Sequence, residues 1–272
     1  MKIRLDELLV KRGLCESREK AQRLILGGQV FLEGSPRLVK PATLVEETLP
    51  LTILQKPRFV SRGGEKLEKA LLEFGIHPQG LSFADIGAST GGFTDCLLQY
   101  GAQKVYAVDV GHGQLHETLR NHPRVKVLEK INARYLTLEQ LGEKVDGITV
   151  DVSFISLALL FAPLRNLLKE EGFLLALIKP QFEAGRAKVR KGVVRSSEVH
   201  GEVLFKVVQK AEENLFFLYG LTFSPLLGPK GNIEFWGYWR KQGEPLTEER
   251  RRSIIMETIG EAYSHFREQK CS

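Results

Sequence analysis

The sequence predicts an α/β protein, in which a doubly wound, mostly parallel β-sheet follows a small α+β domain. From about residue 81 onward, apolar strand-like segments alternate with helical patterns, as is typical of a parallel sheet built from βαβ units. Before that point, residues 1–60 hold 11 Lys and Arg against 7 Asp and Glu, a surplus of +4 within the net charge of +6. Pattern and charge therefore separate two parts of the chain.

The elements of the first part are short. Leucines at helical spacing predict a helix over RLDELLVKRG, residues 4–13. Ser17 is expected to cap a second helix, REKAQRLILGG, residues 18–28, which Gly27 and Gly28 should end. QVFLEGS and LPLTIL are then expected to form short strands.

The stretch RLDELLVKRGLCESREKAQRLILGGQVFLEG, roughly residues 3–34, resembles the S-four (alpha-L) RNA-binding domain. In that family two short helices and a beta turn present basic side chains to structured RNA. Basic groups on a small rigid face can also contact phosphates at little ordering cost. A helical hairpin with merely solvated charges is the alternative. The residues expected to contact RNA here are Arg4, Arg12, Arg18, Lys20 and Arg23.

The second part begins after KPRFVSRGG, which is expected to be a linker running into the helix GEKLEKALLEFG. The strand candidates are SFADIG, KVYAVD, VKVLE, DGITVD, FLLALIK, LYGLTFSP and NIEFWGYWRK. Helical patterns lie in FTDCLLQYG, SLALLFAPLRNLLKE, VLFKVVQKAEENL and the last 25 or so residues. We expect an RNA-binding domain over 1–58, a linker over 59–63, the sheet domain over 64–242 and a helical extension over 243–272.

A glycine loop, ADIGASTGGFT, follows the first strand of the sheet and opens a helix. Glycines there allow a tight turn and a close approach of a ligand to the backbone. Neither GxxxxGK[ST] nor GxGxxG is present, so the loop fits the S-adenosylmethionine (SAM) enzymes better than phosphate-loop or nicotinamide proteins. Generic turn chemistry and a nicotinamide site are the alternatives.

Two further residues belong to this predicted cofactor site. Asp109 ends the second strand, where a carboxylate can accept both hydroxyls of a ribose. Asn132 follows the third strand, where the adenine is usually met. The full set of expected cofactor contacts is Asp85, Gly87, Ala88, Ser89, Gly91, Gly92, Phe93, Asp109 and Asn132.

Four ionisable residues are expected at one end of the sheet. Lys66 opens the helix before the first strand, Asp151 ends the fourth strand, Lys179 ends the fifth, and Glu234 enters the last. Because ligands bind outside the carboxyl ends of parallel strands, Asp151 and Lys179 should face the same site. Such a set suits methyl transfer to a sugar hydroxyl, with a neutral Lys179 taking the proton.

The neutral form of Lys179 needs an explanation, because Asp151 and Glu234 would favour the charged amine and raise its pKa. Desolvation, the nearby Lys66 or the sulfonium of the cofactor would have to offset them, and the acids are better suited to orienting the lysines and the ribose. A strand-end lysine reaching solvent and an exposed Glu234 are the alternatives.

A basic segment, RAKVRKGVVR, follows the fifth strand and is expected to contact RNA phosphates, with a solvated loop as the alternative. In the same region Phe154 could stack on a base, but core packing is the expected role. The basic residues assigned to RNA in the sheet domain are Arg62, Arg186, Lys188, Arg190, Lys191 and Arg195.

The motifs SRGGEKLEKAL, DIGASTGGFTDCLL, VDVSFISL, IKPQFEAGR and GPKGNIEFW resemble, in order, those of the TlyA family, sometimes labelled hemolysin A. That family comprises FtsJ-like ribosomal RNA methyltransferases with an N-terminal S-four domain. The resemblance, over about residues 3–240, implies a Rossmann-like sheet and SAM-dependent 2′-O-methylation of cytidine in ribosomal RNA. It also implies that a Lys–Asp–Lys–Glu tetrad lies at Lys66, Asp151, Lys179 and Glu234, and that ribosomal subunits are the partners.

Composition narrows the remaining classes. The pI of about 9.2 favours a polyanionic partner, and Cys15, Cys96 and Cys271 form neither a CxxC pair nor a metal-binding spacing. We therefore expect a reduced, cytoplasmic protein without a required metal, and no window of 18 apolar residues predicts a membrane span. A non-catalytic RNA-binding assembly factor and a membrane-active hemolysin remain as alternatives.

Overall fold

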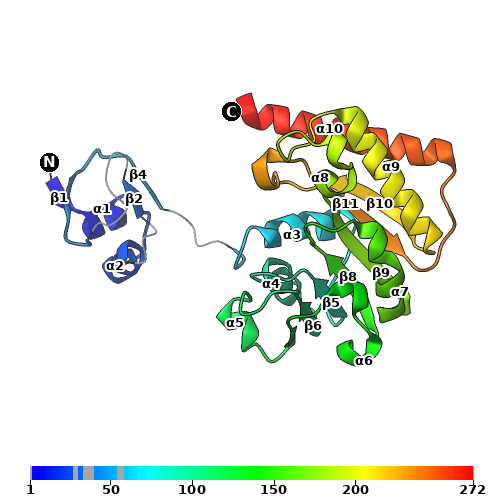
Figure 1. Ribbon diagram of the computed structural model, residues 1–272. Coiled ribbons are helices and arrows are strands. Elements are labelled where there is room, and N and C mark those ends of the chain that lie inside the picture. Colours follow the sequence, from blue (N-terminus) through cyan, green and yellow to red (C-terminus); the bar gives the residue numbers. More distant parts are fainter. Residues whose placement is uncertain (1, 27–29, 33–39, 54–57, 272) are drawn as a thin grey trace. The chain divides into compact units, whose positions relative to one another are not determined.

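The computed structural model describes residues 2–26, 30–32, 40–53 and 58–271, and the chain divides into two compact units, 1–58 and 59–272 (Figure 1). We call them the N-terminal unit and the sheet unit and describe each by itself.

The N-terminal unit has two helices and two small antiparallel ladders. Its core is formed mainly by leucines of α1 and by the apolar face of α2. Ser17 caps α2 as predicted, because its Oγ accepts a hydrogen bond from the backbone N of Lys20 at 3.2 Å. The predicted stop at Gly27 and Gly28 lies outside the described residues. The elements are β1 (Lys2–Arg4), α1 (Leu5–Lys11), α2 (Arg18–Leu26), β2 (Val30–Leu32), β3 (Leu44–Glu46) and β4 (Leu51–Ile53).

β1 and β3 were not predicted from the sequence. Each has three residues, which is too short to show an alternating pattern, and they form a strand pair only with each other. The expected strands in QVFLEGS and LPLTIL are present as β2 and β4, which also pair antiparallel.

The sheet unit contains a seven-stranded sheet in the order β10-β11-β9-β8-β5-β6-β7. The five strands from β9 to β7 are parallel, and β11 runs antiparallel between β9 and β10. The prediction of a doubly wound, mostly parallel sheet is confirmed. The strands are β5 (Ser82–Ile86), β6 (Lys104–Val108), β7 (Val125–Leu128), β8 (Val145–Val150), β9 (Leu168–Ile178), β10 (Phe217–Phe223) and β11 (Phe235–Arg240).

Helices cover both faces of this sheet (Figure 1). β9 is buried on both sides, because Leu174 and Ile178 join the core beneath α7, α9 and α10 while Leu175 and Leu177 join the core beneath α3 and α4. The helices are α3 (Gly63–Glu73), α4 (Gly92–Gln99), α5 (Glu117–Arg120), α6 (Leu138–Leu141), α7 (Phe161–Leu167), α8 (Pro180–Glu183), α9 (Ser197–Glu213) and α10 (Glu248–Cys271).

Two details differ from the sequence-based expectation. The helix expected over SLALLFAPLRNLLKE ends at Leu167, and Leu168 already belongs to β9, whose pairing with β8 begins there. The C-terminal helix α10 contributes Ile255, Ile259 and Phe266 to the larger core. It therefore takes part in the packing of this unit. Among the described residues, no helix is long and apolar enough to cross a membrane.

The sheet order reverses between β5 and β8, because the chain first adds β6 and β7 on one side of β5 and then β8 on the other. A crevice outside the carboxyl ends of the strands at such a point is the usual ligand site in open α/β sheets. The glycine loop leaves β5 there, and Asp151 follows β8.

Candidate active site

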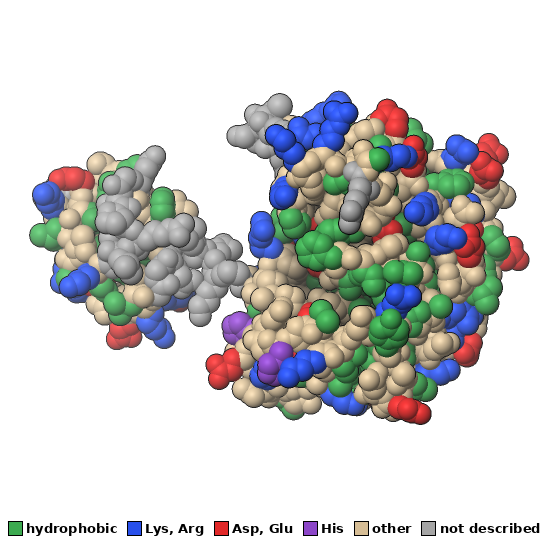
Figure 2. Space-filling view, viewed as in Figure 1, with side chains coloured by type: hydrophobic (Ala, Val, Ile, Leu, Met, Phe, Trp, Pro, Cys, Tyr) green, Lys and Arg blue, Asp and Glu red, His purple; other side chains and the backbone are tan. Residues whose placement is uncertain are grey.

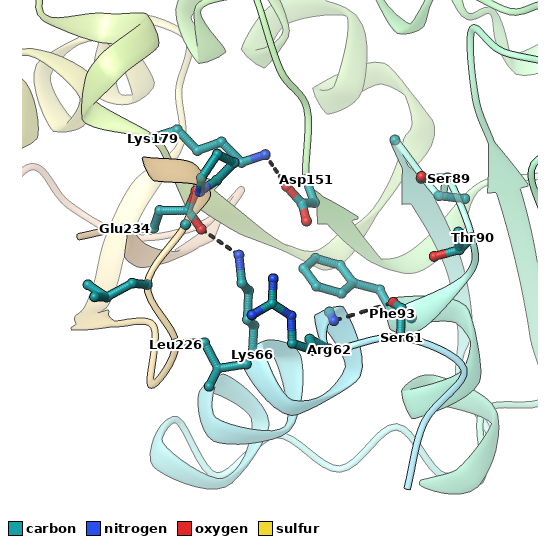
Figure 3. A pocket seen from close by; sticks show the side chains of 17 residues that line it. Ser61, Arg62, Lys66, Ser89, Thr90, Phe93, Asp151, Lys179, Leu226 and Glu234 are labelled. Atoms are coloured by element: carbon teal, nitrogen blue, oxygen red, sulfur yellow. Dashed lines mark hydrogen bonds and ion pairs between the residues drawn. The ribbon is translucent and has the colours of Figure 1, made fainter. Parts of the chain in front are cut away.

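A cavity of about 480 Å³ lies at this switch point (Figure 3). Its walls come from the start of α3, the glycine loop after β5, the ends of β8 and β9, and the loop before β11. All four residues of the predicted tetrad line it, although Lys66 and Glu234 are 168 positions apart in the chain.

The tetrad forms two ion pairs. The Nζ atom of Lys66 lies 2.6 Å from Oε2 of Glu234, and the Nζ atom of Lys179 lies 2.5 Å from Oδ1 of Asp151 (Figure 3). Lys179 also donates a hydrogen bond to Oγ of Ser153 at 3.1 Å. The side chains of Lys66 and Lys179 are only 13% and 10% exposed, so both amines are held in narrow, largely desolvated positions.

Glu234 is fully buried, and its second oxygen, Oε1, has no hydrogen-bond partner among the described residues. The loop before β11 approaches this oxygen closely: a Cβ added at Gly228 would lie 2.1 Å from Oε1. A buried carboxylate oxygen without a donor is costly.

The glycine loop forms the opposite wall. Gly87 has φ of +83°, and a Cβ there would lie 2.3 Å from the carbonyl oxygen of Asp151. Only glycine therefore allows the β5 loop to lie against the end of β8. Ala88, Ser89, Gly92 and Phe93 also line the cavity, and so does Thr90, which the sequence-based set omitted.

Four predicted cofactor residues do not line the cavity: Asp85, Gly91, Asp109 and Asn132. The carboxylate of Asp109 holds the loop, since it accepts hydrogen bonds from the backbone N of Ser89 at 2.8 Å and of Gly111 at 2.7 Å. Asn132 is exposed and uses its side-chain oxygen to accept from the backbone N of Arg134.

Asp85 lies beneath the glycine loop and is fully buried. It accepts hydrogen bonds from the hydroxyls of Thr94, at 2.7 Å, and Thr149, at 3.1 Å, and so joins β5 to α4 and β8. Burial raises the pKa of Asp85 to about 7, since neither partner is a cation. The predicted direct contact with a cofactor is therefore replaced by a supporting position.

The basic segment after α8 is mixed in its contacts. Lys188 forms an ion pair with Glu202, whereas Arg190, Lys191 and Arg195 are exposed and have no carboxylate partner among the described residues. The side chain of Arg186 lies outside the described part. Lys230, which sequence reasoning missed, donates to the backbone O of Lys191 at 3.4 Å, and no sequence spacing signals this approach.

Phe154 contradicts its expected role in the core. Its side chain is 90% exposed, its φ is +66°, and its ring centroid lies 5.0 Å from that of Phe182. The loop after β8 therefore presents an aromatic ring to solvent, directly after Ser153, which accepts a hydrogen bond from Lys179. Arg62, at the start of α3, is exposed and also lines the cavity. Lys and Arg side chains are spread over the face of this unit seen in Figure 2.

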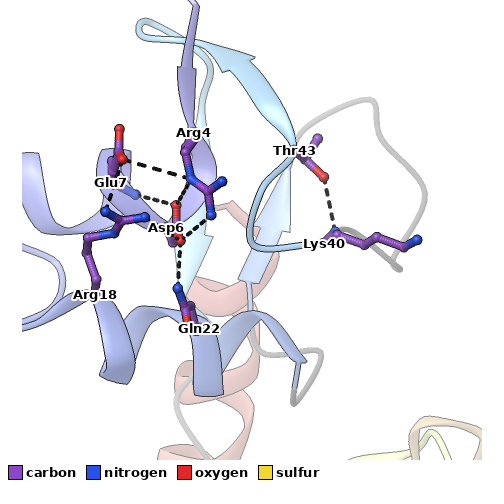
Figure 4. A network of polar contacts seen from close by, with 7 residues as sticks. All are labelled: Arg4, Asp6, Glu7, Arg18, Gln22, Lys40 and Thr43. Carbon is purple, nitrogen blue, oxygen red and sulfur yellow. Dashed lines mark hydrogen bonds and ion pairs between the residues drawn. The ribbon is translucent and has the colours of Figure 1, made fainter.

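In the N-terminal unit, most of the predicted RNA-contacting residues have partners, and Figure 4 shows those of Arg4 and Arg18. Arg4 forms two hydrogen bonds with the buried Asp6, at 3.0 and 2.9 Å, and Arg18 reaches both Asp6 and Glu7. Two other residues are also engaged: Lys20 pairs with Glu16 at 3.0 Å, and Arg12 donates to the backbone O of Leu49. Arg23 is exposed, and the described residues offer it no ion-pair partner.

The sheet order, the glycine loop and the cavity define the class, which is a Rossmann-like methyltransferase. The structure titled "Crystal structure of putative S-adenosylmethionine dependent methyltransferase from Listeria monocytogenes" shares this fold with a TM-score of 0.51 at 16% identity, covering 67% of this chain and 100% of that chain. Within the described residues, no group of three or more His, Cys, Asp or Glu side chains could hold a metal ion.

The family follows from the sequence comparisons. The model of the FtsJ-like methyltransferase matches residues 59–241, and that of the S4 domain, the S-four domain of the sequence analysis, matches residues 3–47. The chain belongs to the FtsJ-like methyltransferase family and carries an N-terminal S4 domain, as the resemblance predicted.

Three relatives cover nearly all of the chain. "Putative rRNA methyltransferase YqxC" of Bacillus subtilis is 47% identical over 99% of this chain and 97% of that protein. "16S/23S rRNA (cytidine-2'-O)-methyltransferase TlyA" of Mycobacterium tuberculosis is 45% identical over 88% of this chain and 90% of that protein. The solved structure "Putative hemolysin from Streptococcus thermophilus" is 41% identical, with a TM-score of 0.77, covering 100% of this chain and 99% of that chain.

Proposed function

We propose that this methyltransferase transfers the methyl group of SAM to the 2′-hydroxyl of a cytidine in ribosomal RNA. The observation that carries the proposal is the convergence of two lysine–carboxylate pairs on one cavity opposite a glycine loop. The names of the relatives support the choice of substrate, since the Mycobacterium protein is named for cytidine-2′-O methylation of 16S and 23S rRNA.

The residues around the glycine loop fit SAM. Gly87 lets the loop lie against the end of β8, the hydroxyls of Ser89 and Thr90 are exposed at the cavity, and Phe93 offers an apolar wall. Each oxygen of Asp109 accepts one hydrogen bond and keeps a second lone pair, which a ribose hydroxyl can use. SAM, when bound, supplies a methyl group activated by its sulfonium charge. We keep Asn132 as a proposed edge contact for the adenine.

The four tetrad residues divide the work on the hydroxyl. Lys179 is the proposed base that takes the 2′-hydroxyl proton, and Ser153 fixes the direction of its amine. Asp151 lies 2.5 Å from that amine and can orient it toward the substrate hydroxyl. Glu234, oriented by Lys66, has a free oxygen that can accept a hydrogen bond from the ribose.

The RNA is proposed to be held by both units. Arg23 and the other basic residues of the S4 domain would contact phosphates, together with Arg62 and the exposed basic residues after α8. Phe154, exposed beside Phe182, is suited to stacking on an unpaired base next to the cavity. We propose the division 1–58, 59–63, 64–242 and 243–272 for the RNA-binding domain, linker, catalytic domain and α10 region.

Methyl transfer from radiolabelled SAM to purified small and large ribosomal subunits tests the proposal, followed by primer extension to locate the modified nucleotide. We expect label on a cytidine ribose of at least one subunit. A protein that binds ribosomal RNA but transfers no methyl to subunits or free RNA would instead be an assembly factor. Leakage of liposomes at nanomolar protein without RNA or SAM would favour the hemolysin alternative.

A further inference from the structure

Glu183 is a buried carboxylate that the proposed reaction does not use. It ends α8, the helix that begins directly after Lys179, and it is 7% exposed. Burial raises the pKa of this carboxyl, while hydrogen bonds from Leu157 and Ser156 oppose the rise. A carboxylate is buried at a free-energy cost that only well-placed donors offset. Its position therefore needs a structural or functional reason.

Both oxygens of Glu183 bond to the segment that follows β8. Oε2 accepts a hydrogen bond from Oγ of Ser156 at 2.7 Å, and Oε1 accepts from the backbone N of Leu157 at 2.8 Å. Ser156 in turn caps the 3₁₀ helix η2 (Leu157–Leu159) by accepting from the backbone N of Ala158. One side chain thus fastens the far end of the segment 151–157 to the helix after Lys179.

The near end of the same segment contacts the catalytic amine. The backbone N of Asp151 donates to the backbone O of Ile86 at 2.9 Å, and the side chains of Asp151 and Ser153 both contact Lys179. Between the two ends, Phe154 has φ of +66°, a left-handed conformation that costs free energy for a bulky residue. Such a conformation persists only when both ends are held.

We propose that Glu183 is a positioning residue, whose two hydrogen bonds hold the segment 151–157 so that Asp151 and Ser153 stay against Lys179. The inference rests on the proposed function, in which Lys179 and Asp151 act on the substrate hydroxyl. Without these bonds the segment can relax at Phe154 and loosen the contacts at the amine. Among the described residues, Glu183 forms its hydrogen bonds with Ser156 and Leu157 and none with the glycine loop, so binding of SAM should be little affected.

The test compares Glu183→Ala and Glu183→Gln with a matched control, Glu212→Ala. Glu212 lies on α9, is 11% exposed, and also accepts from a backbone N, that of Leu246, while pairing with Arg251 away from the cavity. Steady-state methyl transfer to ribosomal subunits gives kcat, and calorimetry gives the affinity for SAM. All variants are assayed well below their unfolding temperatures.

For Glu183→Ala we expect kcat to fall about 10- to 100-fold, with the Kd for SAM changed less than about threefold. Glu183→Gln keeps an oxygen for the backbone N of Leu157 and should recover kcat to within about fivefold of wild type. Glu212→Ala should lower the unfolding temperature but leave kcat within about threefold of wild type.

Three results would overturn the inference: an unchanged kcat in Glu183→Ala, a glutamine variant as slow as the alanine variant, or an equal loss of kcat in Glu212→Ala. A loss of SAM affinity that matches the loss of kcat would also overturn it. Failure of the proposed function would look different, because the wild-type protein itself would then transfer no methyl group.

Discussion

Two aspartates are fully buried, one in each unit, and their pKa values move in opposite directions. Asp6 of the N-terminal unit is bonded to the guanidinium of Arg4, which holds the pKa of Asp6 well below its usual range. Asp85 of the sheet unit accepts hydrogen bonds from two threonine hydroxyls, and burial raises its pKa to about 7. Both side chains are hidden from solvent, but their charge preferences are opposite, because Asp6 has a cation beside it whereas Asp85 has only hydroxyls and is more strongly desolvated.

The contrast lies in where each unit places its cations. In the N-terminal unit, Arg4 and Arg18 form ion pairs with Asp6 and so help to stabilise a small core. In the other unit, Lys66 and Lys179 point into the cavity, and their carboxylate partners line it too, while Asp85 below receives only hydroxyls. Arg4 and Arg18 therefore support the core of their unit, whereas the ion pairs of Lys66 and Lys179 lie at the wall of a cavity.

The largest expected effect is that of Lys179→Ala. If its amine takes the substrate proton, kcat should fall by at least about 1000-fold, with SAM and RNA affinity nearly unchanged. Lys169→Ala is the matched control, since Lys169 lies on β9, the strand that Lys179 follows, and pairs with Asp146 at 2.8 Å but is 50% exposed outside the cavity. Single-turnover methyl transfer measures both, and a Lys179→Ala rate within about tenfold of wild type would refute its role as base.

Asp85→Asn should reveal the raised pKa of Asp85. The folded pKa of about 7 lies above the ordinary value, so wild-type stability from this group is present at low pH and is lost as pH rises through 7. Asparagine mimics the neutral acid, so the stability of the variant relative to wild type should rise between pH 4 and pH 7 by up to about 4 kcal/mol, and then level off.

Urea unfolding of both proteins across this pH range measures the difference. A stability difference that does not change with pH would mean that the carboxyl of Asp85 is ionised over this whole range. The proposed difference in charge preference between Asp85 and Asp6 would then be wrong. Thr118→Ala, on helix α5, serves as a control, because this substitution changes no contact of a buried carboxylate.

Asp6→Asn should act in the opposite sense, by destabilising the N-terminal unit about 2 kcal/mol at neutral pH, because Arg4 and Arg18 lose a buried anion. Hydrogen exchange of the α1 and α2 amides reports this locally. Glu47→Gln removes the partly exposed partner of Lys11 and should cost much less. Equal protection in Asp6→Asn and wild type would show that the Asp6 network adds nothing to this core.

Much of this architecture could be predicted from sequence because its signals are local. The apolar run before Lys179 and the glycines after β5 mark the ends of neighbouring strands, and parallel order brings those ends together. Periodicity does not report which tertiary anchors act on a residue. Phe154 was expected in the core, but its side chain is exposed. That exposure depends on contacts at both ends of its loop, including those of Glu183, which the sequence does not show.

The sequence also did not predict which partners the charged residues contact. Arg4 and Arg18 have the same spacing whether they face solvent or Asp6, and only the fold places Asp6 at the centre of their network (Figure 4). The interior position of Asp85 follows from the pairing of β5 with β8, since Thr149 comes from a strand 64 residues later. Sequence spacing placed the four tetrad residues at one end of the sheet, where they line one cavity, but it did not give their contacts.

The smallest expected effect separates two arginines of α2 that the sequence treats alike. Arg23→Ala removes an exposed cation that the described residues leave without an ion-pair partner, so it should weaken RNA binding about threefold and reduce the slope of log K against log salt by about 0.7–0.9. Arg18→Ala also removes bonds to Asp6 and Glu7, at 3.4 and 3.3 Å, so it should in addition increase hydrogen exchange in α1. Titrations of ribosomal RNA at several salt concentrations, with exchange on the same proteins, measure both. If both variants changed RNA affinity and exchange alike, the distinction between cations held by the core and cations available to a ligand would not apply within the S4 domain.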